Sequence, residues 1–388
     1  MPKLIRVTTV PMSLKVLLRG QMRFMREAGF EVIMVSADGI ELNDVKEFEG
    51  CRHELVNMTR QITPFKDLKA IWRLYRLFKK EKPDIVHSHT PKAGLLAMIA
   101  AKLSGVPIRI HTVAGLRFTT TTGLFRWVLV EMEKFTYRFA THVWPNSKTI
   151  MEFLRENRLV RQDKLGMIGK GSSNGIDLTR FSQAALDPVK MEAIKKLIGF
   201  DPALIYILAV GRIVKDKGTS ELLDAFVRLA EEEVRVRLVM VGTLEDDLDP
   251  ISDESRKILT THQGIINAGW HDEVEYFMHT CTYFVHASYR EGFPNVLLQA
   301  GAMGCPIICS RIEGNIDIVE ENVSGVIFTV RNADDLYKKL KFAIKNHEKM
   351  REMADCLKRN IEEHFDQRAV MNEMKNRYLE LLEKRKTR

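Results

Sequence analysis

Near residue 290 the sequence places a group that could bind hydroxyls directly after an apolar run. Tyr283-Phe-Val-His-Ala287 is followed by Ser288-Tyr-Arg-Glu-Gly292, and residues 293–304 have the composition of a short helix ending in glycine. The pattern predicts a strand, a charged turn and a helix, with Glu291 at the carboxyl end of the strand. A carboxylate there can accept hydrogen bonds from the hydroxyls of a ligand. The alternative is that Glu291 only stabilises the helix dipole.

A second group of charged residues follows the apolar run 204–211. Arg212, Lys215 and Lys217 lie in a short loop before Gly218, where a helix is expected to begin. Backbone N–H groups at a helix start, together with fixed cations, form a phosphate site. A solvated basic loop is the alternative. The Gly-x-Gly-x-x-Gly pattern of dinucleotide-binding folds is missing here, which disfavours NAD.

Histidines and acidic residues supply the remaining candidates. His111 is expected at the end of an apolar strand, where it could donate a hydrogen bond to a ligand. The alternative is a core histidine whose hydrogen bonds are made within the protein. His87 and His89 are similar candidates. The three lack the spacing of a zinc site on one helix. Asp247 and Asp249 have the spacing of an Asp-x-Asp metal motif but lie in an acidic loop typical of solvent-exposed segments. We therefore expect no metal site.

The net charge of +8 is unevenly distributed. Residues 1–170 contain 29 Lys and Arg against 16 Asp and Glu, whereas residues 171–388 contain 30 against 35. The two parts therefore carry net charges of +13 and −5. This asymmetry predicts an anionic partner for the first half, and charge alone allows both nucleic acid and an anionic membrane.

The length of 388 residues favours two domains. Apolar strands alternate with helical stretches, and the pattern restarts after the polar segment 170–175, which predicts an α/β protein with two Rossmann-like doubly wound domains facing across a cleft. We expect domains at residues 1–172 and 173–365, and a helix at 366–388 that packs back toward the first domain. The ligand site is expected beyond the carboxyl ends of the strands. The expected strands are 3–10, 30–36, 84–89, 108–113, 142–146, 204–211, 234–242, 283–286, 306–309 and 325–328, and the expected helices are 13–28, 66–81, 92–104, 123–140, 147–157, 218–232, 294–303, 333–346 and 347–384.

Two helical segments combine aromatic and basic residues. In helix 66–81 one apolar stripe is expected to comprise Leu68, Ile71, Trp72, Tyr75 and Phe78. This helix either packs on the core with a solvated basic face or lies on a membrane surface. Most aromatic residues of segment 116–139 are expected in the core. They are Phe118, Phe125, Trp127, Phe135, Tyr137 and Phe139.

The remaining observations concern the cellular compartment of the protein. No apolar stretch approaches the roughly 18 residues of a membrane span, and the start of the chain does not resemble a signal peptide. The five cysteines form no Cys-x-x-Cys pair, which is typical of a reduced, cytosolic protein.

These motifs together resemble a retaining glycosyltransferase of the GT-B fold, family 4 (glycosyl transferases group 1), in the branch that builds bacterial surface polysaccharides and lipid-linked oligosaccharides. The segment Arg290-Glu-Gly-Phe-Pro-Asn-Val-Leu-Leu-Gln-Ala300 is similar to the family's Glu-x7-Glu signature. The other matching segments are Gly211-Arg212 with Lys217-Gly218, Asn174-Gly-Ile-Asp-Leu-Thr-Arg-Phe181, His87-Ser-His-Thr-Pro-Lys-Ala-Gly94 and Ile110-His-Thr-Val-Ala-Gly-Leu-Arg-Phe118.

The resemblance implies roles for individual residues. Arg212 and Lys217 would hold the donor's diphosphate and stabilise the leaving group, Glu291 would bond the hydroxyls of the donor sugar, and His111 would sit over the reacting sugar. The further donor-binding positions implied are Gly211, Gly242, Trp270, Gly292, Phe293, Pro294, Asn295, Val296 and Gln299. The acceptor-side positions implied are Ser13, Lys15, His89 and Lys92.

The implied reaction is metal-independent and needs no cofactor. A hexose or N-acetylhexosamine would pass from a nucleotide sugar, expected to be UDP-linked, to a lipid-linked glycan acceptor with retention of configuration. The implied partners include an anionic membrane and exclude nucleic acid, and the implied location is cytoplasmic, at the inner face of the cytoplasmic membrane. The alternatives are a UDP-sugar 2-epimerase on the same fold and a catalytically weakened sugar-nucleotide-binding protein.

Two positions depart from the family pattern. Gln299 stands where the family has its second Glu, which bonds the ribose hydroxyls, so one charge is lost. The first loop, Val10-Pro-Met-Ser13, lacks the family's Gly-Gly pair, and Ser13 is expected to cap the following helix instead.

Overall fold

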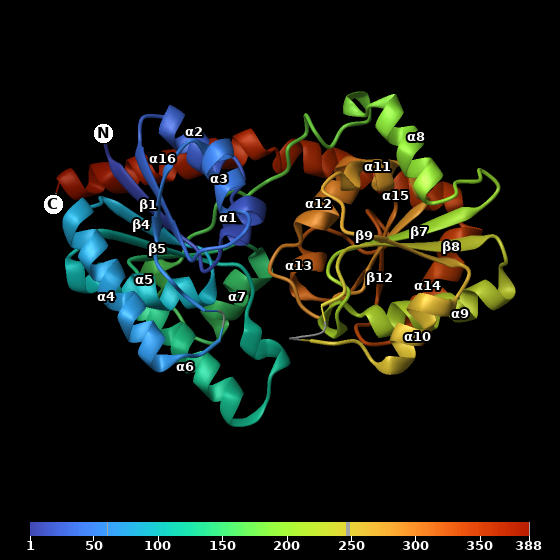
Figure 1. The fold of residues 1–388 in the computed structure, drawn as a ribbon, viewed down its shortest axis with the longest axis horizontal. Helices are drawn as coiled ribbons and strands as arrows, with labels where there is room; N and C mark the ends of the chain where they lie inside the picture. Colours follow the sequence, from blue (N-terminus) through green and yellow to red (C-terminus); the bar gives the residue numbers. More distant parts are fainter. Residues whose placement is uncertain (60, 246–248, 388) are drawn as a thin grey trace. The chain divides into compact units, whose positions relative to one another are not determined.

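The computed structural model describes residues 1–59, 61–245 and 249–387 and divides the chain into two compact units (Figure 1). The N-terminal unit comprises Met1–Gly175 and Arg368–Arg388, and the C-terminal unit comprises Ile176–Gln367. The chain therefore crosses between the units twice, after Gly175 and after Gln367. The boundaries expected from the sequence, after residues 172 and 365, lie three and two residues before these crossings.

The N-terminal unit is built on a six-stranded, fully parallel sheet in the order β3-β2-β1-β4-β5-β6. Its strands are β1 (Lys3–Val7), β2 (Glu31–Ser36), β3 (Arg52–Leu55), β4 (Ile85–Ser88), β5 (Ile108–Val113) and β6 (His142–Pro145). The central strands are apolar on both faces because helices cover both. One face carries α1 (Pro11–Leu17), α2 (Gln21–Glu27), α3 (Leu42–Glu49) and α16 (Gln367–Lys386); the other carries α4 (Pro64–Glu81), α5 (Pro91–Ser104), α6 (Gly123–Phe139) and α7 (Lys148–Glu156).

The C-terminal unit repeats this plan in the order β12-β11-β10-β7-β8-β9. Its strands are β7 (Ile205–Val210), β8 (Val236–Val241), β9 (Ile265–Gly269), β10 (Tyr283–His286), β11 (Ile307–Ser310) and β12 (Val326–Phe328). One core contains residues of α8 (Pro188–Leu197), α11 (Val274–Thr280) and α12 (Asn295–Ala302), the opposite core contains residues of α9 (Thr219–Glu232), α10 (Asp253–Thr261) and α14 (Ala333–Lys345), and α15 (His347–His364) contributes to both. The shorter helices are α13 (Glu313–Ile316), η1 (Arg117–Thr120), η2 (Gln162–Lys164), η3 (Gln183–Ala185) and η4 (Lys215–Lys217). The predicted α/β class and doubly wound sheets are confirmed.

Several predicted elements were wrong in extent. The first strand ends at Val7 instead of residue 10, and the single helix expected at 13–28 is two helices separated at Gly20, which adopts φ of 80°. The helix expected at 347–384 is interrupted at Phe365 and Asp366, where the chain pairs with Ile176. The sequence reading omitted β3, β9, α3, α8, α10, α11 and α13.

The apolar stripe expected on α4 was wrong at Leu68 and Trp72, whereas Ile71, Tyr75 and Phe78 pack against the core. The side chains buried on this helix include Leu74 and Phe78, whereas Leu68 and Trp72 are 64% and 55% exposed. The expectation that most aromatics of 116–139 lie in the core was also wrong. Phe118 and Tyr137 are buried and Phe139 is partly buried, but the other three are exposed. These are Phe125, Trp127 and Phe135.

Tyr378 fixes α16 to the sheet of the N-terminal unit. Its ring is fully buried and stacks on Trp144 with centroids 5.8 Å apart. Its hydroxyl oxygen accepts a hydrogen bond from Nη1 of Arg6 at 3.0 Å and lies 2.6 Å from Nδ1 of His87. Because Arg6 and His87 are also buried, the hydroxyl satisfies two groups that no solvent reaches.

Tyr378→Phe is expected to destabilise the N-terminal unit by about 1–3 kcal/mol, because it leaves Arg6 and His87 without this partner. Hydrogen exchange of the β1 and β4 amides measures the loss. Tyr337→Phe is the control, since the Tyr337 hydroxyl bonds Glu232 at an exposed position of the other unit. Equal protection in the Tyr378 variant and the wild type would contradict the expectation.

Candidate functional site

Glu291 lies in the loop that joins β10 to α12. β10 ends at His286, and α12 begins at Asn295 directly after Pro294, whose fixed φ suits the start of a helix. Because the sheet is parallel, this loop lies at the carboxyl-terminal edge, as do the loops after β7 and β8. The sequence-based placement of Glu291 at a strand's carboxyl end agrees with this arrangement.

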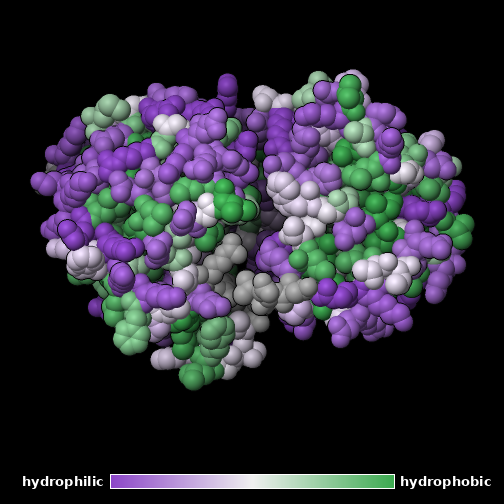
Figure 2. Space-filling model, in the orientation of Figure 1, coloured by the Kyte–Doolittle hydropathy of each residue, from purple (hydrophilic) through white to green (hydrophobic). Residues whose placement is uncertain are grey.

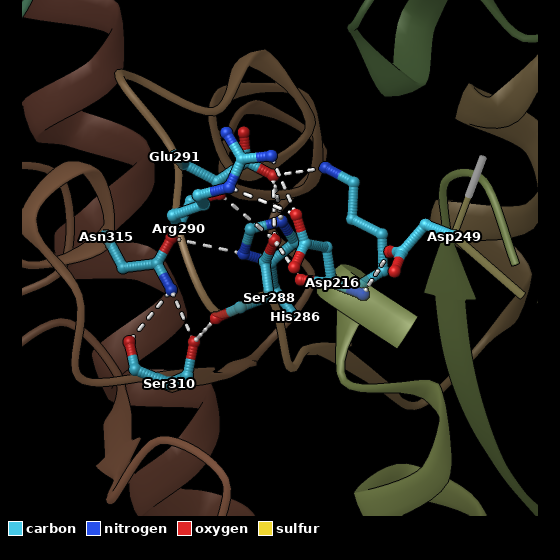
Figure 3. A network of polar contacts seen from close by, with 9 residues as sticks. Asp216, Asp249, His286, Ser288, Arg290, Glu291, Ser310 and Asn315 are labelled. Atoms are coloured by element: carbon cyan, nitrogen blue, oxygen red, sulfur yellow. Dashed lines mark hydrogen bonds and ion pairs between the residues drawn. The ribbon is translucent and has the colours of Figure 1, made fainter. Parts of the chain in front are cut away.

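Lys217 reaches the same edge through the turn between β7 and α9. Gly218 begins α9 with φ of 67°, and a Cβ atom on it would lie 2.1 Å from the carbonyl oxygen of Ala287. Only glycine allows the turn to pack so closely against the end of β10. This contact brings Lys217, 74 residues away in sequence, onto Glu291, where its ammonium donates to Oε1 of the carboxylate (Figure 3).

Three groups surround the Glu291 carboxylate. Lys217 forms an ion pair with it, Ser288 donates its hydroxyl to Oε1 at 3.0 Å, and Nε2 of His286 lies 3.6 Å away. Burial on its own would raise the pKa of Glu291, but the charge of Lys217 and the neighbouring His286 outweigh burial and hold that pKa well below its usual range. Glu291 is therefore an ionised, oriented acceptor at neutral pH.

Two further cations of this edge, Arg212 and Arg290, also have acidic partners, whereas Lys215 of the same loop is exposed. Arg212 donates to Glu245 at 2.7 Å, and Arg290 forms two hydrogen bonds to Asp216 at 3.0 and 2.7 Å. The backbone N–H of Asp216 donates to Asp249 at 2.7 Å. Sequence reasoning named Arg212 but missed the Arg290–Asp216 pair, although Arg290 stands beside Glu291 in the sequence.

The remaining donor-side positions lie at the same edge. Gly211, Gly242 and Trp270 directly follow β7, β8 and β9, and Trp270 is exposed. Gly242 has φ of 152°, and a Cβ atom on it would meet the carbonyl oxygen of Gly211 at 1.8 Å. Gly292, Phe293 and Pro294 lie in the loop after Glu291, while Asn295, Val296 and Gln299 belong to α12. Phe293 packs in the core against Phe365 with ring centroids 5.4 Å apart.

The histidines of the N-terminal unit are more deeply buried than expected. β5 has the expected bounds and ends at Val113, so His111 lies two residues inside the strand and not at its end. Its Nδ1 is 2.9 Å from the Ser88 hydroxyl, and burial lowers the pKa of His111 to about 4. It is therefore neutral at physiological pH. His89 follows β4, and neither of its buried ring nitrogens has a partner among the described residues.

The other acceptor-side candidates are held by neighbouring groups. Lys92 is buried near the start of α5, and its ammonium contacts Asp67 of α4. Lys15 pairs with Asp44 at 3.2 Å. Ser13 does not cap a helix, which corrects that expectation. α1 begins two residues earlier, at Pro11, and Ser13 lies inside its first turn.

Two further observations bear on binding. Within the described ranges, no three His, Cys, Asp or Glu side chains gather to hold a metal ion, and Asp247 of the acidic pair lies outside those ranges. A hollow of about 730 Å³ in the C-terminal unit lies at the amino ends of β7, β10 and β11, the edge opposite Glu291, and none of the predicted site residues lines it. The charged groups around Lys217 therefore lie at the carboxyl edge of the sheet. There the cations could bind a phosphate, and the carboxylate could bind the hydroxyls of a neighbouring group.

Comparison with known proteins supports this interpretation. Residues 190–360 match the family of glycosyl transferases group 1, and residues 15–171 match the glycosyl transferase 4-like domain. The capsular polysaccharide biosynthesis glycosyltransferase CapM of Staphylococcus aureus is 34% identical over 378 residues, which cover 97% of this chain and 96% of CapM. The UDP-Gal:alpha-D-GlcNAc-diphosphoundecaprenol alpha-1,3-galactosyltransferase of Escherichia coli is 27% identical and covers 80% of this chain, with 79% of its own length matched.

A solved structure shows the same fold. HepE of Anabaena in complex with UDP and glucose superposes with a TM-score of 0.82 at 16% identity, covering 97% of this chain and 99% of HepE. Each unit of the present chain contains one parallel, doubly wound sheet, and the two sheets together are those of the GT-B architecture. With its two domain matches and its 34% identity to CapM over nearly its whole length, the chain belongs to the group 1 (family 4) glycosyltransferases.

Proposed function

We propose that this glycosyltransferase moves a hexose or N-acetylhexosamine from a UDP-sugar to a lipid-linked glycan acceptor in surface polysaccharide synthesis, with retention of configuration and without a metal ion. The observation that carries the proposal is the contact between Lys217 and Glu291 at the carboxyl edge of the C-terminal sheet. An ammonium beside a partly buried carboxylate supports the proposal, because a nucleotide sugar offers a diphosphate to the first and hydroxyls to the second.

Each residue has a defined role in the proposed reaction. Lys217 and Arg212 bind the diphosphate and stabilise the charge that develops on it as the bond to the sugar's anomeric carbon breaks. Glu291 accepts hydrogen bonds from the sugar's hydroxyls. The acceptor hydroxyl attacks the anomeric carbon on the face that the diphosphate leaves, and its proton passes to the departing phosphate oxygen. No second carboxylate is needed as a base.

The residues proposed for the acceptor belong to the N-terminal unit. His111, neutral at physiological pH, can donate or accept one hydrogen bond near the reacting sugar. Neither ring nitrogen of His89 has a hydrogen-bond partner in the described part of the chain, so both could bond an acceptor. Lys15 and Lys92 would contribute positive charge toward a lipid diphosphate after exchanging their present carboxylate partners.

Relatives guide the choice of substrates. By its name, the Escherichia coli relative uses UDP-Gal and an acceptor on diphosphoundecaprenol, and CapM acts in capsule synthesis. The first test is therefore a thermal-shift screen of nucleotide sugars, followed by transfer assays with diphosphoundecaprenol-linked saccharides. Stabilisation by a UDP-sugar and formation of a longer lipid-linked saccharide support the proposal. No transfer with any stabilising donor would overturn it.

Gln299 weakens the ribose side of the proposed donor site. Its amide oxygen can accept one hydrogen bond from a ribose hydroxyl but carries no charge. Its side chain is partly exposed on α12, about one turn after the start of the helix. We expect Glu at this position to strengthen UDP binding more than it changes the transfer step.

We also propose that the protein works at the anionic inner face of the cytoplasmic membrane. No helix within the described residues is long and apolar enough to span a bilayer. α4 and α6 both pack on α5, and hydrophobic surface is visible on the part of the N-terminal unit where they lie (Figure 2). The exposed apolar side chains of the two helices are Phe65, Leu68, Trp72, Leu124, Phe125, Trp127 and Phe135.

Basic side chains accompany this apolar surface. Lys66, Lys69 and Arg76 are exposed on α4, and the Arg76 guanidinium lies over the Trp72 ring at 4.8 Å. Aromatic rings bind at the interfacial region of a bilayer, while each nearby Lys or Arg contributes about 1 kcal/mol on an anionic surface. This charge complementarity favours an anionic lipid surface as the occupant.

Replacing Phe65, Leu68 and Trp72 together by Ser is expected to weaken binding to phosphatidylglycerol-containing vesicles by about tenfold or more, because these side chains no longer enter the interface. Sedimentation with vesicles measures the change. Val189→Ser with Leu197→Ser is the control, since both are exposed apolar residues of α8 in the other unit. Equal sedimentation of the triple variant and the wild type would remove α4 from the proposed membrane surface.

A further inference from the structure

Glu291 has a second basic neighbour besides Lys217, the imidazole of His286 at the end of β10. Nε2 of His286 lies 3.6 Å from Oε1 of Glu291, and the His286 side chain is only 6% exposed. The protein groups around the ring therefore set its orientation. The partner of one imidazole nitrogen decides whether the other nitrogen carries a proton in the neutral ring.

That partner is Asn315, in α13. Its Oδ1 lies 3.1 Å from Nδ1 of His286, and its Nδ2 donates to the carbonyl and hydroxyl oxygens of Ser310 at 2.8 and 3.1 Å. The Ser310 hydroxyl donates in turn to the carbonyl of Ser288, so its oxygen remains an acceptor for Asn315 (Figure 3). A reversed amide would set Oδ1 against the Ser310 carbonyl oxygen, which is repulsive. The network therefore fixes the amide oxygen toward the imidazole.

The direction of these hydrogen bonds determines which nitrogen of His286 carries a hydrogen. An amide oxygen can only accept, so Nδ1 of His286 carries a hydrogen. Nε2 then faces the Glu291 carboxylate either as a bare lone pair, which the carboxylate repels, or protonated, as the cation of an ion pair. We propose that Asn315 is a positioning residue that, through His286, gives Glu291 a second cationic partner.

This inference rests on the proposed function, in which Lys217 binds the donor's diphosphate. That diphosphate competes with Glu291 for the Lys217 ammonium. The His286 ring cannot turn away from Glu291 toward the diphosphate, because Asn315 holds its other ring nitrogen and both side chains are buried. The other charged pairs of this edge, Arg212 with Glu245 and Arg290 with Asp216, are occupied by their own partners. His286 thus keeps Glu291 ionised and oriented toward the sugar's hydroxyls while Lys217 serves the diphosphate.

The nitrogen-15 NMR spectrum of the His286 ring in the wild-type protein without any ligand tests the inference directly. The signals are assigned by their loss in His286→Gln. We expect both ring nitrogens to carry a hydrogen, Nδ1 facing Asn315 and Nε2 facing Glu291. A neutral ring, whichever nitrogen carries its single hydrogen, would overturn the inference. This result does not depend on any donor, so it is separable from a failure of transfer activity.

Asn315→Leu provides the second measurement. With the acceptor at Nδ1 removed, the neutral ring is expected to shift its hydrogen to Nε2 and donate it to Glu291. Asn360→Leu, on α15 of the same unit, is the control and should leave the His286 spectrum unchanged. Retention of the Nδ1 hydrogen in Asn315→Leu contradicts the inference. If that variant does not fold, the wild-type spectrum decides alone.

Kinetics distinguish positioning from a merely structural role. Asn315→Leu should bind UDP within about twofold of the wild type, because UDP does not reach Glu291 as a sugar does. Its kcat with the donor found in the screen should fall about tenfold. A parallel loss of UDP affinity and kcat would show that Asn315 only supports the fold of this edge, which overturns the positioning role.

Discussion

Glu291→Ala is expected to lower kcat/KM for sugar transfer by about 100-fold, with UDP affinity changed little. The variant removes the carboxylate that accepts hydrogen bonds from the donor sugar, and one such transition-state contact supplies about 3 kcal/mol. It also leaves Lys217 and His286 without their shared partner. Initial rates at varied donor concentration measure the effect.

A graded series sharpens this expectation. Glu291→Gln keeps one accepting oxygen but loses the charge, so its rate should lie between those of the wild type and Glu291→Ala. Glu348→Ala, at an exposed position of α15, serves as the control and should transfer at the wild-type rate. A Glu291→Ala enzyme within about twofold of the wild type would show that this carboxylate takes no part in the transition state.

Lys217→Ala is expected to reduce kcat by about tenfold or more and to weaken UDP binding as well. The lost ammonium both holds the diphosphate and stabilises it as a leaving group, so the ground state and the transition state are both affected. Calorimetric titration with UDP, together with single-turnover transfer, separates the two effects.

The Lys217→Ala variant needs its own control because Glu291 loses an ion-pair partner. Lys257→Ala removes an exposed lysine from α10 of the same unit and should change neither UDP affinity nor rate. Lys217→Arg preserves the charge in a larger, planar group and is expected to recover only part of the activity. Unchanged UDP affinity in Lys217→Ala would refute the diphosphate role.

The main features of the candidate site could be predicted from the sequence because two motifs end at parallel strands. The apolar run before Gly211 and the one before Ser288 each predict a strand, and carboxyl ends of parallel strands share one edge. Gly218 supplied the remaining signal, since a glycine between a charged loop and a helix start suits a close turn. The structure adds that this turn packs on Ala287 and brings Lys217 into contact with Glu291.

Other features depended on packing that no local pattern reveals. Asn315 lies in α13, which has four residues and therefore shows no helical periodicity. The stripe on α4 was wrong at Leu68 and Trp72 because periodicity gives the spacing of apolar residues but not which of them the neighbouring helices cover. Trp72 satisfies the spacing and still faces solvent. The bounds 108–113 were predicted correctly, so only the description of His111 as the end of that strand was wrong.

The most direct test of the central claim is one incubation with two arms. The protein is mixed with the UDP-sugar that stabilises it, either alone or with a diphosphoundecaprenol-linked saccharide, and both sugar and lipid products are analysed. The proposed function predicts a lipid-linked saccharide one sugar longer and UDP in equal amount, formed only when the acceptor is present. A UDP-sugar epimerised at C2 in the arm without acceptor would contradict it.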